Sequence, residues 1–116
     1  MRGRCGTADA VDAARDVRRL GVFGGTFDPI HVGHLIIAEE ARARIGLDRV
    51  LFVPARVPPH RSRLAFASGE DRYRMVQVAI EDNASFEVSD IELNRDGPSF
   101  TVDTLRAIRS QYGPQA

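Results

Sequence analysis

Two histidines, His31 and His34, stand three residues apart shortly after a glycine pair, Gly24 and Gly25. A spacing of three places both side chains on one face at the start of a helix. The first N–H groups of a helix are unpaired, and its N-terminal end carries positive partial charge, so phosphate binds there readily. Glycine has no side chain and lets a ligand approach the backbone. The segment therefore predicts a polyphosphate site.

The same residues allow simpler interpretations. A Gly-Gly turn is common in proteins, and a pair of surface histidines can lack any function. The pair could also supply two ligands to a metal ion, but zinc requires further nitrogen, sulfur or carboxylate ligands, and none has a suitable local spacing. We favour the phosphate site and predict no metal held by protein ligands.

The elements that would position these residues are read from the apolar pattern. The short apolar run over 20–23 ends at the glycine pair and predicts a buried strand. Residues 32–45 predict a helix that buries one broad apolar face and ends at Gly46. A second apolar run over 50–53 predicts another buried strand. Two strands joined by a helical crossover pair in parallel, so the histidines would lie at the carboxyl end of the first strand, where α/β sheets bind ligands.

The remainder of the chain continues the alternation of strands and helices. Ser68 is predicted to cap a helix that ends near Glu81. Alternating apolar and polar residues over 86–93 predict a third strand with a bulge or break at Asp90. Ser99 is predicted to cap a last helix. The order βαβαβα predicts an α/β fold with parallel strands.

The composition limits the function classes. The chain has 116 residues, enough for one domain, and its 16 basic and 16 acidic residues cancel. A neutral chain gives no electrostatic case for nucleic-acid or membrane binding. One cysteine excludes an internal disulfide, and no apolar run is long enough for a membrane span or a secretory signal. We predict a cytoplasmic protein with a loose extension over 1–17 and a domain over 18–116.

All basic residues are arginine, and lysine is absent. Codon bias in a GC-rich genome is the simpler explanation of this usage. Its consequence is that any cation that binds phosphate here must be arginine or histidine. Arginine suits that role because its planar fork can hold two phosphate oxygens at once.

Three segments carry a resemblance to a known family. His31, Gly33 and His34 form His-x-Gly-His, which resembles the nucleotidyltransferase superfamily related to class I aminoacyl-tRNA synthetases. The sequences PPHR at 58–61 and GPSFTVDTL at 97–105 resemble two segments of bacterial nicotinate-nucleotide adenylyltransferases. The resemblance covers residues 19 to about 114. It implies the N-terminal half of a Rossmann-like nucleotidyltransferase fold.

The resemblance also implies a reaction. ATP and nicotinate mononucleotide would give nicotinate adenine dinucleotide and pyrophosphate, a step of NAD biosynthesis. The mononucleotide phosphate would attack the α-phosphorus in line, so catalysis would rest on positioning and charge stabilisation. Mg²⁺ would accompany the ATP phosphates, mainly through phosphate oxygens and water. The alternatives are a related adenylyltransferase of the pantetheine-phosphate type and an inactive nucleotide-binding fragment.

The resemblance assigns roles to particular residues. His31 and His34 would be catalytic and would bind the ATP phosphates together with Arg61. The nicotinate mononucleotide would contact His60, Arg61 and Thr101. The remaining positions of the phosphate site would be Gly24, Gly25, Thr26, Phe27 and Gly33. The family fold continues well beyond residue 116, so the resemblance implies that these residues alone have little activity, while the oligomeric state stays open.

Overall fold

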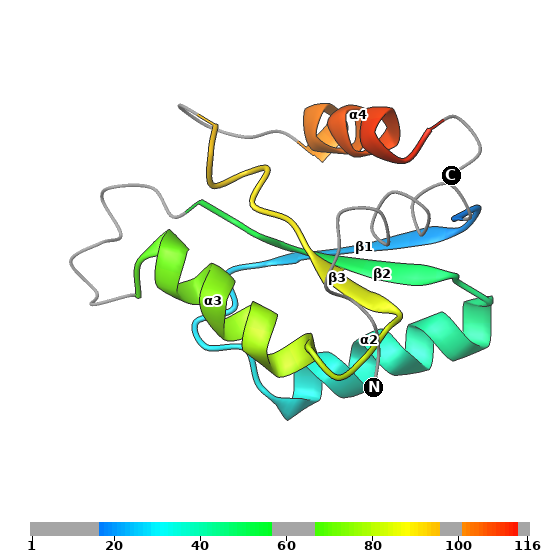
Figure 1. Ribbon diagram of the computed structural model, residues 1–116, viewed down its shortest axis with the longest axis horizontal. Coiled ribbons are helices and arrows are strands. Elements are labelled where there is room, and N and C mark those ends of the chain that lie inside the picture. The colour runs from blue at the N-terminus through cyan, green and yellow to red at the C-terminus, as the bar shows by residue number, and fades with distance from the viewer. Residues whose placement is uncertain (1–16, 57–66, 96–100, 114–116) are drawn as a thin grey trace.

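The protein is described by a computed structural model at residues 17–56, 67–95 and 101–113. Three parallel strands form one sheet in the order β1-β2-β3, with helices between and after them (Figure 1). This arrangement confirms the predicted βαβαβα order. The bounds of the elements are β1 Leu20–Gly25, α2 Val32–Ile45, β2 Arg49–Pro54, α3 Gly69–Ile80, β3 Phe86–Val88 and α4 Thr101–Tyr112.

The pairing of β1 with β2 confirms the first predicted crossover. Phe23 lies opposite Phe52, and Gly25 lies opposite Pro54 at the carboxyl ends of the two strands. The ladder continues one residue further, because Ala55 donates its N–H to the Gly25 carbonyl at 2.8 Å. The helix α2 connects these strands, as the apolar runs on either side of it predicted.

The sheet has helices on both faces. In Figure 1, α2 and α3 lie on one side of the strands and α4 lies on the other. Successive residues of a strand point to opposite faces. Phe52 therefore packs in a cluster on the α2 and α3 side, whereas Leu51 and Val53 pack with Ile108 of α4. This two-sided burial explains the continuous apolar run of β2.

Val17 belongs to the packed fold. Its side chain is 1% exposed and lies in the same cluster as Leu51, Ile108 and Tyr112. The predicted loose extension ended at Val17, whereas this residue is packed against the described fold. The rest of the predicted extension lies outside the described residues.

The third strand is shorter than the apolar alternation predicted. β3 ends at Val88, and a turn follows instead of a strand that continues to Leu93. The Asp90 carbonyl accepts the N–H of Leu93 at 2.9 Å, and the Ser89 hydroxyl accepts the N–H of Ile91 at 3.2 Å. These bonds replace the sheet ladder, so the predicted break near Asp90 is a turn that ends the strand.

The bounds and the end of α2 match their prediction, but its burial does not. Gly46 ends the helix in the left-handed conformation with φ 77°, and its N–H donates to the Arg42 carbonyl at 3.0 Å. Among its residues only Ala38 is buried, whereas Ile36 is 57% and Ile37 60% exposed. The expected broad buried face is therefore wrong for the described fold, because α2 contacts the sheet along a narrow stripe.

The third helix begins as the sequence predicted. The Ser68 hydroxyl accepts the N–H of Asp71 at 3.0 Å and caps α3. The predicted cap of α4, Ser99, lies outside the described residues. Across the described ranges, we find no helix with the length and apolar character needed to cross a membrane.

Candidate phosphate-binding site

The two predicted site histidines cap α2 and each other. His31 is the N-cap residue, and its Nδ1 accepts the N–H of Gly33 at 3.1 Å. His34, three residues later, returns its Nδ1 to accept the N–H of His31 at 3.0 Å. This is a capping box built from two imidazoles instead of the usual hydroxyl and carboxylate or amide. The prediction that both histidines lie on one face at the start of the helix is confirmed.

The caps determine which ring nitrogens remain for a ligand. A neutral imidazole has one nitrogen that accepts and one that donates. Because both Nδ1 atoms accept, both Nε2 atoms carry a proton and can donate. The rings of His31 and His34 are neighbours, with centroids 3.9 Å apart and planes tilted by 30°, so the two Nε2–H donors belong to adjacent rings. Two adjacent N–H donors suit the oxygens of a phosphate group.

The two imidazoles have different surroundings. His31 is exposed, whereas His34 is half-buried, with ring centroids 5.1 Å from Phe27 and 5.9 Å from Phe23. Burial lowers the pKa of His34, and the neighbouring His31 lowers it further. The lowered pKa favours the neutral form of His34, the form that keeps both its cap and its Nε2–H donor.

Gly33 is required by the histidine pair. A Cβ atom at this position would meet Cε1 of His31 at 2.9 Å and Nδ1 at 3.0 Å. Any side chain would therefore push the His31 ring away from the N–H that it accepts. This contact gives a physical reason for glycine between the two histidines.

The two glycines of the pair, Gly24 and Gly25, have different surroundings. A Cβ at Gly25 would lie 3.3 Å from the Phe27 ring, which packs over that glycine. At Gly24, by contrast, the nearest described atom to a Cβ would be the Val53 carbonyl oxygen at 4.0 Å. The described fold thus leaves space beside Gly24 that a ligand can use, whereas Gly25 admits the Phe27 ring.

The residues that join β1 to α2 contribute their backbone. Phe27 is 2% exposed, so its side chain belongs to the core and only its backbone can face a ligand. It has a φ of 51°, in the region that L residues seldom adopt. Strain of this kind persists where the surrounding structure holds it and often lies at a functional loop. Gly24 to Phe27, the residues predicted to cradle phosphate, lie at the carboxyl end of β1 and directly after it.

The N-terminal end of α2 is electrostatically open. Its first turn contains no acidic residue, so its N–H groups and positive dipole end are not already served by a carboxylate. The first turn of α3, in contrast, contains Glu70 and Asp71. Of these two helix starts, that of α2 is the one suited to an anionic ligand.

Sequence reasoning missed Arg72, which contacts the loop between β1 and α2 from α3. Its buried guanidinium donates to the carbonyl of Thr26 at 2.9 Å. The signal that could have found it is its place on α3. Arg72, Val76 and Ile80 are four residues apart and form the buried stripe of that helix. An arginine at an apolar position of such a stripe indicates a buried, hydrogen-bonded cation.

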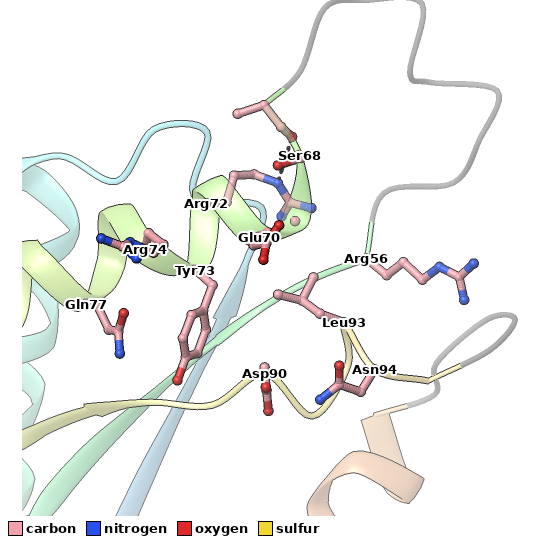
Figure 2. A pocket seen from close by; sticks show the side chains of 12 residues that line it. Arg56, Ser68, Glu70, Arg72, Tyr73, Arg74, Gln77, Asp90, Leu93 and Asn94 are labelled. Atoms are coloured by element: carbon pink, nitrogen blue, oxygen red, sulfur yellow. Dashed lines mark hydrogen bonds between the residues drawn. The ribbon is translucent and has the colours of Figure 1, made fainter.

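A cavity of about 780 Å³ lies at the same end of the sheet, between α3 and the turn after β3. Figure 2 shows its lining side chains, among them Arg56, Arg72, Tyr73 and Asp90. Its described lining contains none of the predicted residues between Gly24 and His34. The cavity is therefore a neighbouring space and does not include the histidine pair.

Several predicted site residues cannot be placed. His60 and Arg61 lie outside the described residues. Thr101 begins α4, but its side chain is not described. Within the described ranges, no three His, Cys, Asp or Glu side chains come together as metal ligands. The structure thus brings together the histidine pair and the residues after β1.

Comparison with known sequences identifies relatives. The sequence model of a family described as cytidylyltransferase-like matches residues 22–115. A protein of Shouchella clausii described as a probable nicotinate-nucleotide adenylyltransferase is 51% identical over 96 residues, which cover 83% of this chain and 50% of that protein. A Listeria innocua protein with the same description is 50% identical over 93 residues, covering 80% and 50%. The chain spans about half the length of the curated relatives it matches.

Comparison with solved structures supports the fold. The nicotinic acid mononucleotide adenylyltransferase of Plasmodium falciparum, solved in complex with NaAD, aligns with a TM-score of 0.62 at 18% identity. The alignment covers 80% of this chain and 46% of that protein. A second structure of the same enzyme, in complex with APC, also gives 0.62. At such identities the likeness shows a shared fold.

Proposed function

The chain belongs to the cytidylyltransferase-like family and has a Rossmann-like nucleotidyltransferase fold, and we propose that its site transfers the adenylyl group of ATP to nicotinate mononucleotide. The observation that carries this proposal is the reciprocal cap of His31 and His34, which presents two Nε2–H donors at a helix start with no acidic residue in its first turn. Relatives about 50% identical, described as probable nicotinate-nucleotide adenylyltransferases, support the choice of substrates.

The chemistry needs no nucleophile from the protein. A phosphate oxygen of the mononucleotide attacks the α-phosphorus of ATP, the bond to the β-phosphate oxygen breaks, and pyrophosphate leaves. Negative charge shifts onto the equatorial oxygens and the leaving oxygen during this displacement. The Nε2–H donors of His31 and His34 would stabilise that charge, and the backbone from Gly24 to Phe27 would hold the phosphates in line.

The groups in the described site determine how the predicted Mg²⁺ could be held. Mg²⁺ prefers oxygen ligands, and the described site offers imidazole N–H and backbone N–H groups, which cannot ligate a cation. These residues do not fit a protein-held magnesium ion. We propose that Mg²⁺ enters as part of the ATP complex, held by phosphate oxygens and water.

The cavity beside α3 is the proposed place for the second substrate. Arg56 directly precedes the segment with His60 and Arg61, and Ala67 directly follows that segment. Both residues line the cavity, together with the turn that leads toward Thr101. The position of the cavity thus supports the assignment of His60, Arg61 and Thr101 to nicotinate mononucleotide. Its arginines suit a substrate that carries a phosphate and a carboxylate.

The test is an adenylyl-transfer assay on two proteins. The first is this chain, and the second, called the extended protein, is this chain followed by the part of the Shouchella clausii relative that the match does not cover. Each is incubated with MgATP and nicotinate mononucleotide, and dinucleotide and pyrophosphate are measured. Formation of nicotinate adenine dinucleotide by the extended protein supports the proposal. Transfer to pantetheine phosphate in place of the mononucleotide would instead favour the related adenylyltransferase.

A further inference from the structure

Arg72 joins three backbone segments at the carboxyl end of the sheet. Its Nη1 donates to the carbonyl of Ala55 at 2.7 Å and to that of Thr26 at 2.9 Å, and its Nε donates to the carbonyl of Ala67 at 3.2 Å. These carbonyls belong to the loop after β1, the residue after β2 and the residue before the cap of α3. One side chain, 2% exposed, thereby fixes the relative positions of all three segments.

The charge of Arg72 is not neutralised by a close carboxylate. None of the ion pairs formed within the described ranges includes it. Burial lowers the pKa of the Arg72 guanidinium, and the Asp28 carboxylate opposes that shift only in part. Burial removes the hydration of the cation, and its carbonyl partners offset that cost only in part, so an anion bound nearby would be favoured. Arginine also has five N–H donors in a planar fork, which lets it serve several carbonyls at once.

A second contact holds the same loop. The Asp28 carboxylate accepts the N–H of Ala67 at 3.0 Å, so the loop after β1 is tied to the start of α3 on both sides of Phe27. The peptide between Thr26 and Phe27 is trans, so the Phe27 N–H points away from the carbonyl that Arg72 binds. Among the described residues, this N–H donates to no other backbone group. Within the described ranges it is therefore a donor that remains for a ligand, on the loop that Arg72 holds.

We propose that Arg72 is a positioning residue of the phosphate site: by holding the Thr26 and Ala55 carbonyls, it aims the backbone N–H of the loop after β1 and places a positive charge beneath the bound phosphates. The proposal rests on the function proposed above. Arg72 acts through the loop and is not itself assigned a contact with the reacting atoms.

The first test uses the unmodified chain labelled with ¹⁵N and inorganic pyrophosphate as the probe. We expect pyrophosphate to shift the amide signals of Gly24 and Phe27 and, in the same titration, the Nε–H signal of Arg72. The Nε–H signal of Arg106, exposed on α4, is the control and should stay in place. A titration that shifts the amide signals but not Arg72 would overturn the positioning role alone. A titration that shifts none of them would overturn the phosphate site and, with it, this inference.

The second test compares substitutions that separate charge from geometry. Arg72→Met removes both, Arg72→Lys keeps the charge but cannot span the three carbonyls, and Arg106→Met is the matched control for loss of one arginine. We expect the affinity for pyrophosphate to fall about tenfold or more in both Arg72 variants and to change less than about twofold in the control.

The lysine variant is the sharper of the two because it keeps the charge. If it is folded, as its amide spectrum would show, and binds pyrophosphate within about twofold of the unmodified chain, the positioning role is wrong. If neither Arg72 variant folds, the titration of the unmodified chain decides the matter, because it needs no substitution.

Discussion

Nδ1 of His34 accepts the backbone N–H of His31 at 3.0 Å, which gives each histidine of the pair two functions at once. Their Nδ1 atoms cap α2, and the same hydrogen bonds leave the protons on the two Nε2 atoms. The cap therefore determines the tautomer that phosphate binding needs. Structure and proposed chemistry can be separated only by substitutions that keep the cap and remove the imidazole.

Such substitutions are available. Asparagine is a strong N-cap residue, and glutamine is a standard partner at the third helical position. We expect the free energy of unfolding of the His31→Asn, His34→Gln variant to lie within about 0.5 kcal/mol of that of the unmodified chain. In the double alanine variant it should fall by about 1–2 kcal/mol. Denaturant unfolding measures both. Equal losses in the two variants would show that the imidazoles stabilise the helix by something other than the cap.

Gly33→Ala tests the close contact with His31. A methyl group there would press on the ring at 2.9 Å and displace it from the cap. Alanine is better than glycine in a helix by about 1 kcal/mol, which offsets much of a lost cap worth a similar amount. We expect stability to change by less than about 1 kcal/mol, while pyrophosphate affinity falls about tenfold. Unfolding and titration calorimetry check the two quantities, and unaltered affinity would contradict the account of Gly33.

The lowered pKa of His34 predicts a pH dependence of stability. In the folded chain burial and His31 disfavour protonation, so the unfolded chain binds the proton first. The contribution of His34 is thus complete above about pH 6.5 and is lost as the pH falls through its folded pKa. We expect the free energy of unfolding to decrease with acid in this window and less so in His34→Gln. A slope that is the same in both proteins would mean that His34 does not cause it.

The hydrogen bond of Tyr112 is expected to stabilise the fold at a place far from the phosphate site. Its hydroxyl donates to the Glu87 carboxylate, which also pairs with Arg49 at 2.9 Å, so α4 is tied to β3 and β2. Burial and this hydrogen bond raise the pKa of Tyr112 above its ordinary range. Tyr112→Phe should lower the free energy of unfolding by about 1–3 kcal/mol, because a bond to a charged acceptor is lost. The pyrophosphate affinity should not change, which titration calorimetry would verify.

The open edge of β1 predicts association of this chain. Within the described sheet β1 pairs with β2 only, so one side of its backbone offers unpaired N–H and C=O groups. Val22 on this strand and Ile37 on α2 are exposed. We expect sedimentation to show reversible self-association of the chain that diminishes in the extended protein. A monomer at all concentrations would contradict this expectation.

The first half of the fold was predictable because its signals are local. An apolar run before the glycine pair indicates β1, although the strand continues through Gly25 and none of its residues is buried as predicted. Gly46 in a left-handed conformation ends α2. The histidine pair was predictable for the same reason, since a spacing of three fixes its face on a helix. These features depend on neighbours in sequence and need no knowledge of the sheet.

The features that the sequence did not predict depend on contacts between segments distant in the sequence. Ile91 and Leu93 alternate like a strand, but local bonds from Ser89 and Asp90 turn the chain before they can pair. The apolar residues of α2 indicated a buried face because the pattern cannot say how much of it meets the sheet. Arg72 was missed because its three carbonyl partners come from segments that only the folded chain brings together.

The most direct test of the central claim is the rate of dinucleotide formation from MgATP and nicotinate mononucleotide by the extended protein and by its His31→Asn, His34→Gln variant. We expect turnover of roughly 1 s⁻¹ or faster in the unmodified protein. In the variant, kcat should fall about 10²-fold or more with a smaller change in KM, because the lost donors act on the transition state. Equal turnover in the two proteins, with the cap intact in both, would contradict the assignment of catalysis to the imidazoles.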